Sequence, residues 1–598
     1  MTGNRPQIAE TIADFKISKV AGNGISANLL KLMDPAIEKL LGLDKIKKVY
    51  RENLQGLGDL DFCKESIKMV NAKLRIKKKE LDLIPRTGPV IIVANHPYGG
   101  LDGMILYSML KEVRPDFKIM ANNMLRLFPE LKDHFIFVDA FNQNSVDNIN
   151  PLKQAYRHLQ SEGLLAVFPA GEVSRYEFTK KKVTDGEWND SVARLARMSG
   201  AQIVPVHFSG GNSMSFQIAG LVHPILRTML LPRQMMKRDR KIHVRVGEPI
   251  KSKYIKEFNN PEELCRFLRL KTYLLNEKPK DILNKRRKSQ RKGRNFTVVG
   301  PDVNRELLKA DIESLPAENH LLDCKEFSVY YGNMQQLPNI ILEIGRLREI
   351  TFRDVGEGSG NEYDLDKYDN HYLHLVVWNR EKSEVVGSYR FAPVDKVCTK
   401  HGIRGLYTSN FYKYSNEFKN TISAGLELGR SFVRKEYQKQ FVPLLLLWKG
   451  ICRYIVNHPK YHILFGAVSV SNTYTEKSRY LIANLLVNEN KQVKARKKYQ
   501  CKLKSDPDIK AACKTVKLST LDLLSNLIKG VEKDKDIPIL LKQYMKLGGQ
   551  LYSFTVDHQF GDCLDGLIVV DLKKSPEKTL KLYMEDHIDE YLKFHNLP

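Results

Sequence analysis

The amino-acid sequence predicts two α/β domains in one chain. Between residues 90 and 246, short runs rich in Val, Ile and Leu alternate with segments of helical periodicity, which favours a largely parallel sheet covered by helices. A polar, strongly basic run at residues 284–295 interrupts this pattern, and a second set of strand and helix patterns follows it. A chain of 598 residues is also too long for a single hydrophobic core.

The first domain is expected over residues 1–283, and the basic run lies in a linker over 284–320. Apolar runs bounded by polar or turn residues predict its strands, and apolar residues at helical spacing predict two helices between them. The expected helices are Pro151–Glu162 and Asp190–Ser199, and the expected strands are Val90–Ala94, Lys118–Ala121, Phe135–Val138, Leu164–Phe168, Gln202–His207 and Lys241–Val246.

The second domain is expected over residues 321–598 and has its own order of elements. Residues 472–536 read as mostly helical and polar. The expected helices before them are Ile340–Phe352 and Pro443–Asn457, and the expected strands are His374–Trp378, Glu384–Phe391, Ala424–Val433, Tyr461–Val470, Leu547–Phe554 and Leu564–Asp571.

The composition restricts the class of protein. The net charge of +27 indicates an anionic partner, which could be nucleic acid, an anionic membrane surface or an acidic protein. No zinc-finger or RNA-recognition pattern supports nucleic acid, and the eight cysteines include no Cys-x-x-Cys pair, so we expect no metal site. No apolar run approaches the ~18 residues that span a bilayer, and no signal peptide is evident, so we expect a cytoplasmic chain.

Three segments could contact a membrane. Residues 25–55 carry apolar residues at helical spacing with Lys between them, which suits either a helix on a membrane surface or an ordinary packing helix. Residues 221–239 mix apolar and basic residues as an interfacial segment does. The basic run at 284–295 could be an exposed linker or helix end, or a contact with anionic headgroups. The same string fits a nuclear-localisation signal, which no other feature of the sequence supports. These readings predict a protein bound peripherally to the inner membrane.

The segment Ile91–Gly103 carries the clearest chemical signal. An apolar strand ends in Asn95-His96, a Pro/Gly turn follows, and Asp102 opens a helix. A His oriented by an Asp is a common general base near neutral pH. The segment contains no Ser or Cys, so His96 would deprotonate the substrate itself.

This segment resembles motif I of the glycerolipid (lysophospholipid) acyltransferase family. Five residues separate His96 from Asp102 here, one more than in the common family spacing, as in the hemolysin-like branch. Gly99 and Gly100 can absorb the extra residue, because glycine tolerates tight turns. The resemblance implies that His96 deprotonates an acceptor hydroxyl, that Asp102 orients His96, and that the hydroxyl attacks an acyl thioester. In the alternative interpretation, the segment is a strand–turn–helix in which His96 only caps the turn.

Two further segments extend the resemblance. Residues Gly163–Ser174 are similar to motif III, in which Phe168, Pro169, Gly171 and Ser174 match, and Ile203–Val206 is similar to motif IV. The charged positions of motif III are displaced, to Glu172 and Arg175. In the family that Arg holds the phosphate of the acceptor, a task suited to a guanidinium, so its displacement argues against a phosphate-bearing acceptor. The substrate-binding residues implied by the resemblance are Asn95, Gly103, Phe168, Pro169, Gly171, Glu172 and Arg175.

The second half carries a different set of charged residues. An amine nucleophile binds as a cation and attacks as a free base, so carboxylates such as Asp366, Asp369 and Glu427 could bind it and accept its proton. Arg346, Arg390 and Arg430 could fix these carboxylates, hold the carboxylate of an amino acid, or both. A structural Arg/carboxylate network is the alternative for each residue.

The order of these residues resembles the acyl-homoserine-lactone synthase and ornithine-lipid N-acyltransferase branch of the GNAT fold. Those enzymes transfer an acyl group from a carrier protein to an amine, and the resemblance implies a catalytic role for Glu427. It also implies substrate binding by Arg346, Asp366, Asp369, Arg390 and Arg430.

Together the two halves resemble the bifunctional ornithine-lipid and glycine-lipid synthases of bacteria. The resemblance implies N-acylation of an amino acid with a 3-hydroxyacyl group, followed by O-acylation of that hydroxyl in the first domain. The expected donor is acyl-ACP or acyl-CoA, with acyl carrier protein as partner and no bound cofactor. The alternative is a lysophospholipid acyltransferase whose second domain docks the carrier or the membrane without catalysis.

Overall fold

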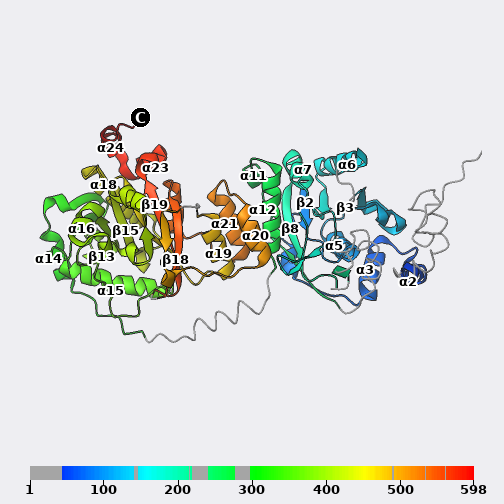
Figure 1. Cartoon of the computed structure of the whole chain (residues 1–598), viewed down its shortest axis with the longest axis horizontal. Coiled ribbons are helices and arrows are strands. Elements are labelled where there is room, and N and C mark those ends of the chain that lie inside the picture. The colour runs from blue at the N-terminus through cyan, green and yellow to red at the C-terminus, as the bar shows by residue number, and fades with distance from the viewer. Residues whose placement is uncertain are drawn as a thin grey trace, which may run out of the picture. The chain divides into compact units, whose positions relative to one another are not determined.

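The computed structural model describes residues 43–139, 146–213, 216–217, 240–276, 296–487, 491–532, 534–558 and 560–597. These residues fold into two compact units, and Figure 1 shows the whole chain. The first unit contains the described residues before Lys278 together with Asp506–Val531, and the second contains the remaining ones. The sequence patterns alone place Asp506–Val531 with the C-terminal domain, whereas the chain folds this segment onto the first unit.

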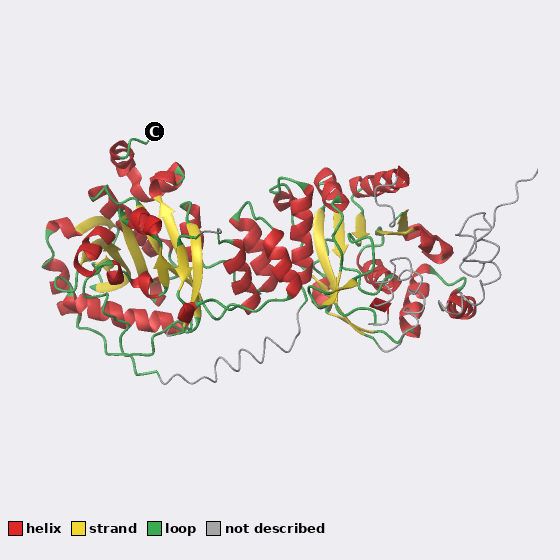
Figure 2. Ribbon diagram, in the orientation of Figure 1, coloured by secondary structure: helices red, strands yellow, loops and turns green. Residues whose placement is uncertain are grey.

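A seven-stranded sheet forms the centre of the first unit, in the order β1-β9-β8-β2-β5-β3-β4. Figure 2 draws strands in yellow and helices in red. β8 and β9 pair antiparallel and the other neighbours pair parallel, which confirms the largely parallel sheet predicted from the sequence. β2 lies between β8 and β5 and is buried along its whole length, hence its continuous apolar run. The strands are β1 (Lys73–Ile76), β2 (Val90–Ala94), β3 (Lys118–Asn122), β4 (Phe135–Val138), β5 (Leu164–Val167), β8 (Gln202–Phe208) and β9 (Lys241–Val246).

Helices and a small hairpin complete the first unit. The hairpin consists of β6 (Arg175–Glu177) and β7 (Lys182–Thr184), which pair antiparallel. The helices are α2 (Leu43–Val49), α3 (Asp59–Met69), α4 (Lys78–Leu81), α5 (Gly100–Val113), α6 (Ile149–Gln160), α7 (Ser191–Ser199), α11 (Ser252–Ile255), α12 (Pro261–Leu274), α20 (Pro507–Thr515) and α21 (Leu521–Val531).

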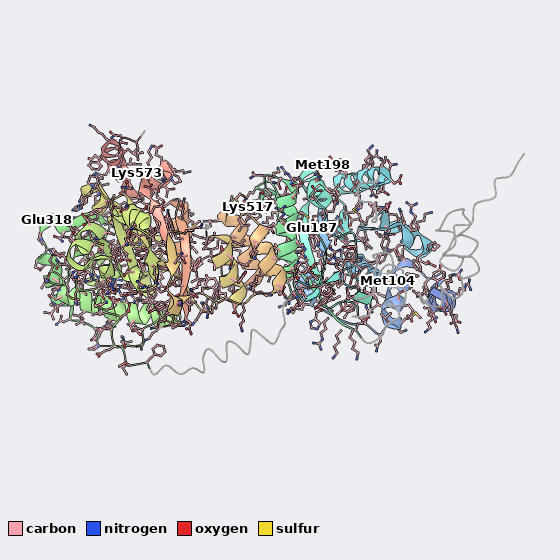
Figure 3. All side chains as sticks on the ribbon, in the orientation of Figure 1. Met104, Glu187, Met198, Glu318, Lys517 and Lys573 are labelled. Carbon is pink, nitrogen blue, oxygen red and sulfur yellow. The ribbon has the colours of Figure 1, made fainter. Side chains whose placement is uncertain are left out.

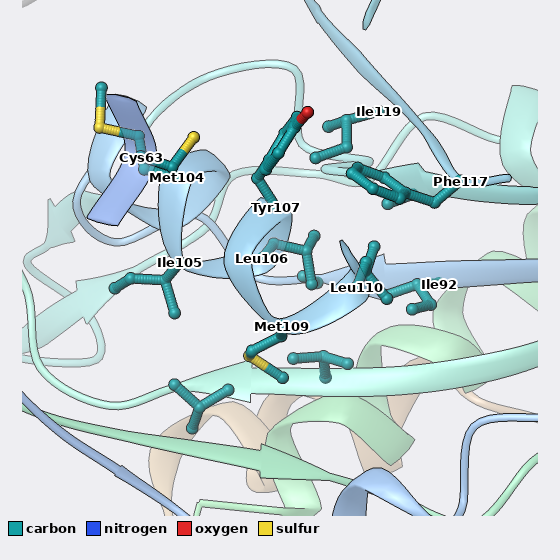
Figure 4. Packing of buried hydrophobic residues seen from close by; sticks show 14 of the residues in the cluster. Cys63, Ile92, Met104, Ile105, Leu106, Tyr107, Met109, Leu110, Phe117 and Ile119 are labelled. Carbon is teal, nitrogen blue, oxygen red and sulfur yellow. The ribbon is translucent and has the colours of Figure 1, made fainter. Parts of the chain in front are cut away.

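Helix α5 follows β2 directly and anchors the hydrophobic core of the first unit. Figures 3 and 4 show Met104, and Figure 4 shows Ile105, Leu106 and Leu110 of the same helix packed among buried apolar side chains. Ile105, Leu106 and Leu110 are fully buried, as is Phe117 after the helix. This packing fixes the start of α5, and with it the position of Asp102 in the first turn.

An eight-stranded sheet forms the centre of the second unit, in the order β10-β11-β12-β13-β15-β16-β19-β18. Four of its strands, β13, β15, β18 and β19, are labelled in Figure 1. β15 and β16 pair parallel and the other neighbours pair antiparallel. The predicted pairing of the strands around residues 374–378 and 384–391 is confirmed. The strands are β10 (His320–Cys324), β11 (Phe327–Gly332), β12 (Leu373–Asn379), β13 (Glu384–Pro393), β15 (Gly425–Val433), β16 (Ile463–Val470), β18 (Gln550–Asp557) and β19 (Cys563–Asp571), and β14 (Tyr412–Tyr414) pairs with β17 (Val493–Ala495) in a small separate sheet.

Long helices accompany this sheet. α15 begins at a proline, which suits the first turn of a helix, and buries one face against apolar residues of the sheet. The helices of the second unit are α14 (Arg305–Glu313), α15 (Pro338–Asp354), α16 (Val394–His401), α17 (Asn416–Ile422), α18 (Phe441–Asn457), α19 (Glu476–Leu485), α22 (Ile539–Lys546), α23 (Glu577–Met584) and α24 (Ile588–Phe594).

The three segments considered for membrane contact lie largely outside the described residues. This applies to 25–42, to 221–239 and to the basic run 284–295, whereas residues 43–54 form α2 and a turn of π-helix. Among the helices that the structure describes, none is long and apolar enough to cross a membrane.

Candidate active sites

The first candidate site lies at the carboxyl end of β2. His96 follows the strand, and its Nδ1 lies 3.1 Å from Oδ2 of Asp102 in the first turn of α5. The backbone N–H groups of Tyr98 and Gly99 donate to the same oxygen at 2.8 and 3.1 Å. Gly99 has a φ of 77°, which a residue with a side chain adopts only with strain. The turn between His96 and Asp102 therefore places the carboxylate against the imidazole.

Burial distinguishes the two side chains of this pair. Asp102 is fully buried, and burial raises the pKa of its carboxyl group while the contact with His96 opposes that shift. The His96 side chain keeps 18% of its surface exposed and stacks on the Phe168 ring at a centroid distance of 4.1 Å. The imidazole is thus oriented from one side by a carboxylate and covered on one face by an aromatic ring.

Asn95 fastens the end of β2 to the neighbouring strand. Its side-chain amide donates to the carbonyl of Phe208 at 2.9 Å, and its side-chain oxygen accepts from the Phe208 N–H at 2.7 Å. Asn95 is buried, so these two hydrogen bonds satisfy polar atoms that would otherwise be costly. This geometry gives Asn95 a structural task beside the substrate-binding one expected from the resemblance.

A second carboxylate, which the sequence did not single out, lies beneath His96. Asp185 Oδ1 accepts from the backbone N–H of His96 at 3.2 Å and from the hydroxyl of Ser174, and Oδ2 accepts from Trp188 Nε1 at 2.9 Å. The Ser174 N–H in turn donates to the His96 carbonyl at 2.9 Å. Asp185 is buried, which raises its pKa. No spacing rule marks an isolated Asp, so the fold alone reveals this contact.

The remaining residues predicted for the first site lie in α5 and in the segment from the end of β5 to the start of β6. Pro169 and Gly103 are buried, and Gly171 adopts a φ of 67° in the turn after β5. The displaced charges of motif III face each other, since Arg175 Nη1 lies 3.4 Å from Glu172 Oε1. Both side chains are at least one-third exposed, so this is an accessible ion pair rather than a buried one.

The second candidate site is a network of Arg and Asp side chains in the second unit. Arg390 Nη1 lies 2.7 Å from Asp366 Oδ1 and 3.1 Å from Asp369 Oδ2. Arg430 Nη2 lies 3.7 Å from Asp366 Oδ2. Four of the residues predicted from the sequence are therefore brought together by β13, β15 and the segment between α15 and β12.

Arg348, at the centre of this network, was not among the predicted binding residues. Its fully buried guanidinium lies 2.8 Å from Asp369 Oδ1 and 3.4 Å from His374 Nδ1. Burial alone would raise the pKa of Asp369, but Arg348 and Arg390 outweigh it and hold that pKa well below its usual range. Burial and Arg348 lower the pKa of His374 to about 3, so this His is neutral at physiological pH.

Arg346 lies apart from this network. It forms a bidentate pair with Glu343 at 2.7 and 2.8 Å and a third contact with Asp302 at 2.7 Å. Residues two positions apart on a helix face different directions, so Arg346 and Arg348 cannot serve the same site. The geometry of Arg346 is that of a structural ion pair on α15.

Glu427 occupies a closed pocket of hydrogen-bond donors. Its carboxylate accepts from the Thr408 N–H at 2.8 Å, the Tyr407 N–H at 2.9 Å and the hydroxyls of Thr408 and Tyr372. It is buried, which raises its pKa. The Tyr372 ring also lies under the Arg390 guanidinium at 5.2 Å, which connects Glu427 to the network.

Beside these residues the parallel strands β15 and β16 diverge. Their pairing runs from Gly425 opposite Ile463 to Leu428 opposite Gly466, although both strands continue beyond it. Arg430 follows two residues later with a φ of 52°, next to an irregularity in the β13–β15 ladder. The divergence leaves strand edges at which an extended ligand can bind. Among the described residues no group of His, Cys, Asp and Glu could hold a metal ion.

Two family models match the chain. The Acyltransferase model matches residues 64–281, which contain His96 and Asp102, and the Acetyltransferase (GNAT) domain model matches residues 347–448, which contain the Arg/Asp network. These matches confirm the fold class predicted from the sequence. An acyltransferase domain joined to a GNAT domain defines the chain as an acyltransferase.

Curated relatives are more specific. A glycine N(alpha)-acyltransferase of Bacteroides thetaiotaomicron is 30% identical over 313 residues, which cover 49% of this chain and 92% of that protein. A lyso-glycine lipid O-acyltransferase of the same organism is 24% identical over 247 residues, or 40% of this chain and 88% of the relative. An L-ornithine N(alpha)-acyltransferase of Rhizobium meliloti is 25% identical, and the matched region covers 40% of this chain and 77% of that protein. The chain belongs to the family of the glycine N(alpha)-acyltransferases.

Proposed function

We propose that this chain makes a diacylated amino-acid lipid in two steps. The second unit acylates the amine of glycine or ornithine with a 3-hydroxyacyl group, and the first unit then acylates the 3-hydroxyl. The observation that carries this proposal is the similarity of one chain to both a glycine N(alpha)-acyltransferase and a lyso-glycine lipid O-acyltransferase. The expected domains, 1–283 and 321–598, would each supply one step, with Asp506–Val531 added to the first.

In the N-acylation step the amino acid binds at the Arg/Asp network. Asp366 is partly exposed and can pair with the ammonium group, while Arg430 can hold the carboxylate of the amino acid. Glu427 takes a proton from the amine through the Tyr372 hydroxyl, since burial makes this carboxylate more basic. The free amine attacks the thioester carbon, the C–N bond forms as the C–S bond breaks, and the nitrogen loses a proton to the thiolate, which leaves as the thiol.

In the O-acylation step His96 removes the proton of the 3-hydroxyl, and the oxygen attacks a second acyl thioester. The C–O bond forms as the C–S bond breaks, and the imidazolium returns its proton to the leaving thiolate. Asp102 keeps Nδ1 protonated and stabilises the imidazolium. The exposed pair of Glu172 and Arg175 binds the polar head of the acceptor, and Gly103, Phe168, Pro169 and Gly171 shape the site beside it.

The donor is acyl-ACP or acyl-CoA, and we place its thioester arm where β15 and β16 diverge. A carrier protein is acidic, so the net charge of +27 suits it, and the same charge suits an anionic membrane surface. We therefore place the chain on the cytoplasmic face of the inner membrane as a peripheral protein.

The test is expression in a bacterium that lacks amino-acid lipids, followed by mass spectrometry of the lipids. Wild type should produce a new diacylated amino-acid lipid, His96→Ala should accumulate the mono-N-acyl form, and Glu427→Gln should make neither. If wild type makes no amino-acid lipid but rescues a lysophosphatidate acyltransferase defect, the alternative function is correct. If Glu427→Gln and Arg430→Ala leave the lipids unchanged, the second unit docks a partner without catalysis.

A further inference from the structure

Two helices from late in the chain form part of the first unit. α20 and α21 pack on α12, although more than 200 residues separate them from it in sequence (Figure 1). Lys271 of α12 donates to the carbonyl of Asn526 at 3.1 Å, and Ser519 donates to the Glu257 carbonyl at 3.1 Å. Lys517, labelled in Figure 3, lies in the loop that joins the two helices. The first unit is therefore built from both halves of the chain.

One residue of this segment is a buried carboxylate among cations. The Asp508 side chain is 1% exposed, and its oxygens lie 2.9 Å from Lys180, 2.8 Å from Lys182 and 3.5 Å from Arg269. It also accepts from the Thr184 hydroxyl at 2.9 Å. Burial alone would raise its pKa, but Lys182, Lys180 and Arg269 lower it, so Asp508 is ionised at neutral pH.

The contacts of Asp508 with Lys180, Lys182 and Thr184 lie on the β6–β7 hairpin, whereas Arg269 belongs to α12. The two ends of the hairpin contact the backbone of His96. Ser174 precedes β6, and its N–H donates to the His96 carbonyl at 2.9 Å. Asp185 follows β7, and its carboxylate accepts from the His96 N–H at 3.2 Å. Asp508 reaches Thr184, which is the residue directly before Asp185. The hairpin therefore forms a continuous path from Asp508 to the backbone of His96.

The path is reinforced beside Asp185. The Asp185 N–H donates to the Tyr273 hydroxyl at 2.9 Å, and that hydroxyl lies 3.0 Å from Thr184 Oγ1. Arg269, held by Asp508, donates to the Asp185 carbonyl at 3.1 Å. Two residues of α12 thus support the same end of the hairpin, and one of them depends on Asp508 for charge balance.

We propose that Asp508 is a positioning residue for His96, supplied to the O-acyltransfer site by the second half of the chain. This rests on the proposed role of His96 in O-acylation. Without the negative charge of Asp508, three partly buried cations repel one another across the hairpin. The hairpin then relaxes, and the loss of fixed geometry at His96 slows catalysis more than it weakens substrate binding.

The test compares Asp508→Asn with wild type in the full-length protein. We expect kcat for O-acylation of a supplied lyso-aminolipid to fall about tenfold with KM little changed. N-acylation by the second unit should continue and serves as an internal control for folding. The matched control is Asp506→Asn at the N-cap of the same helix, because it removes a charge near Lys182 and asparagine keeps the helix cap. It should leave both activities near those of wild type.

Two readouts separate positioning from general stability. Hydrogen exchange in Asp508→Asn should accelerate at residues 174–185 and 96–99 while the rest of the first unit stays protected. Adding Lys182→Gln, which removes one of the repelling cations, should restore much of the lost kcat in a double-mutant cycle.

The outcomes distinguish the failures. If Asp508→Asn has the same kcat and the same hydrogen exchange as wild type, the proposal is wrong. It is also wrong if Asp508→Asn loses protection from exchange uniformly across the first unit and adding Lys182→Gln does not restore it. If wild type itself does not acylate the lyso-aminolipid, the proposed function fails, and exchange at residues 96–99 alone decides whether Asp508 positions His96.

Discussion

At the scale of single residues, Asp102 can act only if its charge and its contact with His96 are both present. It is fully buried, and two backbone N–H groups already fix one of its oxygens. Asp102→Asn keeps the shape but replaces an acceptor with an amide that can present a donor to His96. We expect O-acylation to fall by roughly 100-fold or more, with accumulation of the mono-N-acyl product measured by mass spectrometry.

The control for this variant is Asp82→Asn, which alters an exposed carboxylate paired with Arg86 in the same unit. Exposed pairs contribute little, so its O-acylation should match that of wild type. Wild-type activity in Asp102→Asn would instead mean that the carboxylate does not orient His96.

A group of buried carboxylates makes the stability of the second unit depend on pH. Burial raises the pKa of Asp565 to about 8 and that of Glu357 to about 7, and Asp557 near Asp565 adds to the first shift. The folded chain therefore holds protons that the unfolded chain releases at a lower pH. The stability that results is complete below about pH 4 and is lost as pH rises through 7 and 8.

We therefore expect the midpoint of urea unfolding of the second unit to fall between pH 6 and pH 9. Asp565→Asn carries no proton that pH can remove, so the variant should lose less stability over the same range. The measurement is a set of urea titrations of both proteins monitored by fluorescence. If the unfolding midpoint changed equally with pH in the two proteins, the pH dependence would belong to other groups.

At the scale of elements, the sequence predicted strands well where a strand is a continuous apolar run, as buried strands of a parallel sheet are, or alternates apolar and polar residues, as a half-buried strand does. Val90–Ala94, Phe135–Val138 and Lys241–Val246 have the predicted bounds. Two arginines of α15 show where this reasoning ends. Arg346 and Arg348 look alike in sequence, and only the orientation of α15 decides which one enters the network.

Contacts between distant elements could not be predicted from spacing. Asp185 and Asp508 belong to no recognisable motif, and their contacts with His96 and Lys182 join segments that are far apart in sequence. The apolar faces of α20 and α21 predict that these helices are buried, but an apolar face does not specify which partner covers it. The division of the chain into units therefore depends on packing rather than on local pattern.

The divergence of β15 and β16 starts at a close backbone approach that requires glycine. A Cβ atom on Gly466 would lie 2.0 Å from the Leu428 carbonyl oxygen, whereas one on Gly429 would meet nothing within 4 Å. Gly466→Ala should therefore push the strands apart, lower the free energy of unfolding by about 1–3 kcal/mol and reduce N-acylation. Gly429→Ala should be tolerated in both assays. Thermal unfolding and the rate of N-acylation check this, and equal behaviour of the two variants would contradict it.

At the scale of the whole molecule, the central feature is that two acyl-transfer sites share one polypeptide. The first reaction makes a hydroxyl that the second reaction consumes, if the proposed sequence of steps is correct. Tethering two sites raises the effective concentration of one at the other, often to the millimolar range for short flexible linkers. The intermediate then meets the second site of the same chain before it is diluted.

An equimolar mixture of His96→Ala and Glu427→Gln chains tests this directly, because each chain retains one activity and both chains are full length. The mixture should accumulate mono-N-acyl intermediate early in the reaction and form the diacylated product after a lag, whereas wild type should show neither. The measurement is a time course of both lipids at equal total activity of each site. Since the two preparations differ only in whether the sites share a chain, identical time courses would mean that the fusion confers no kinetic advantage.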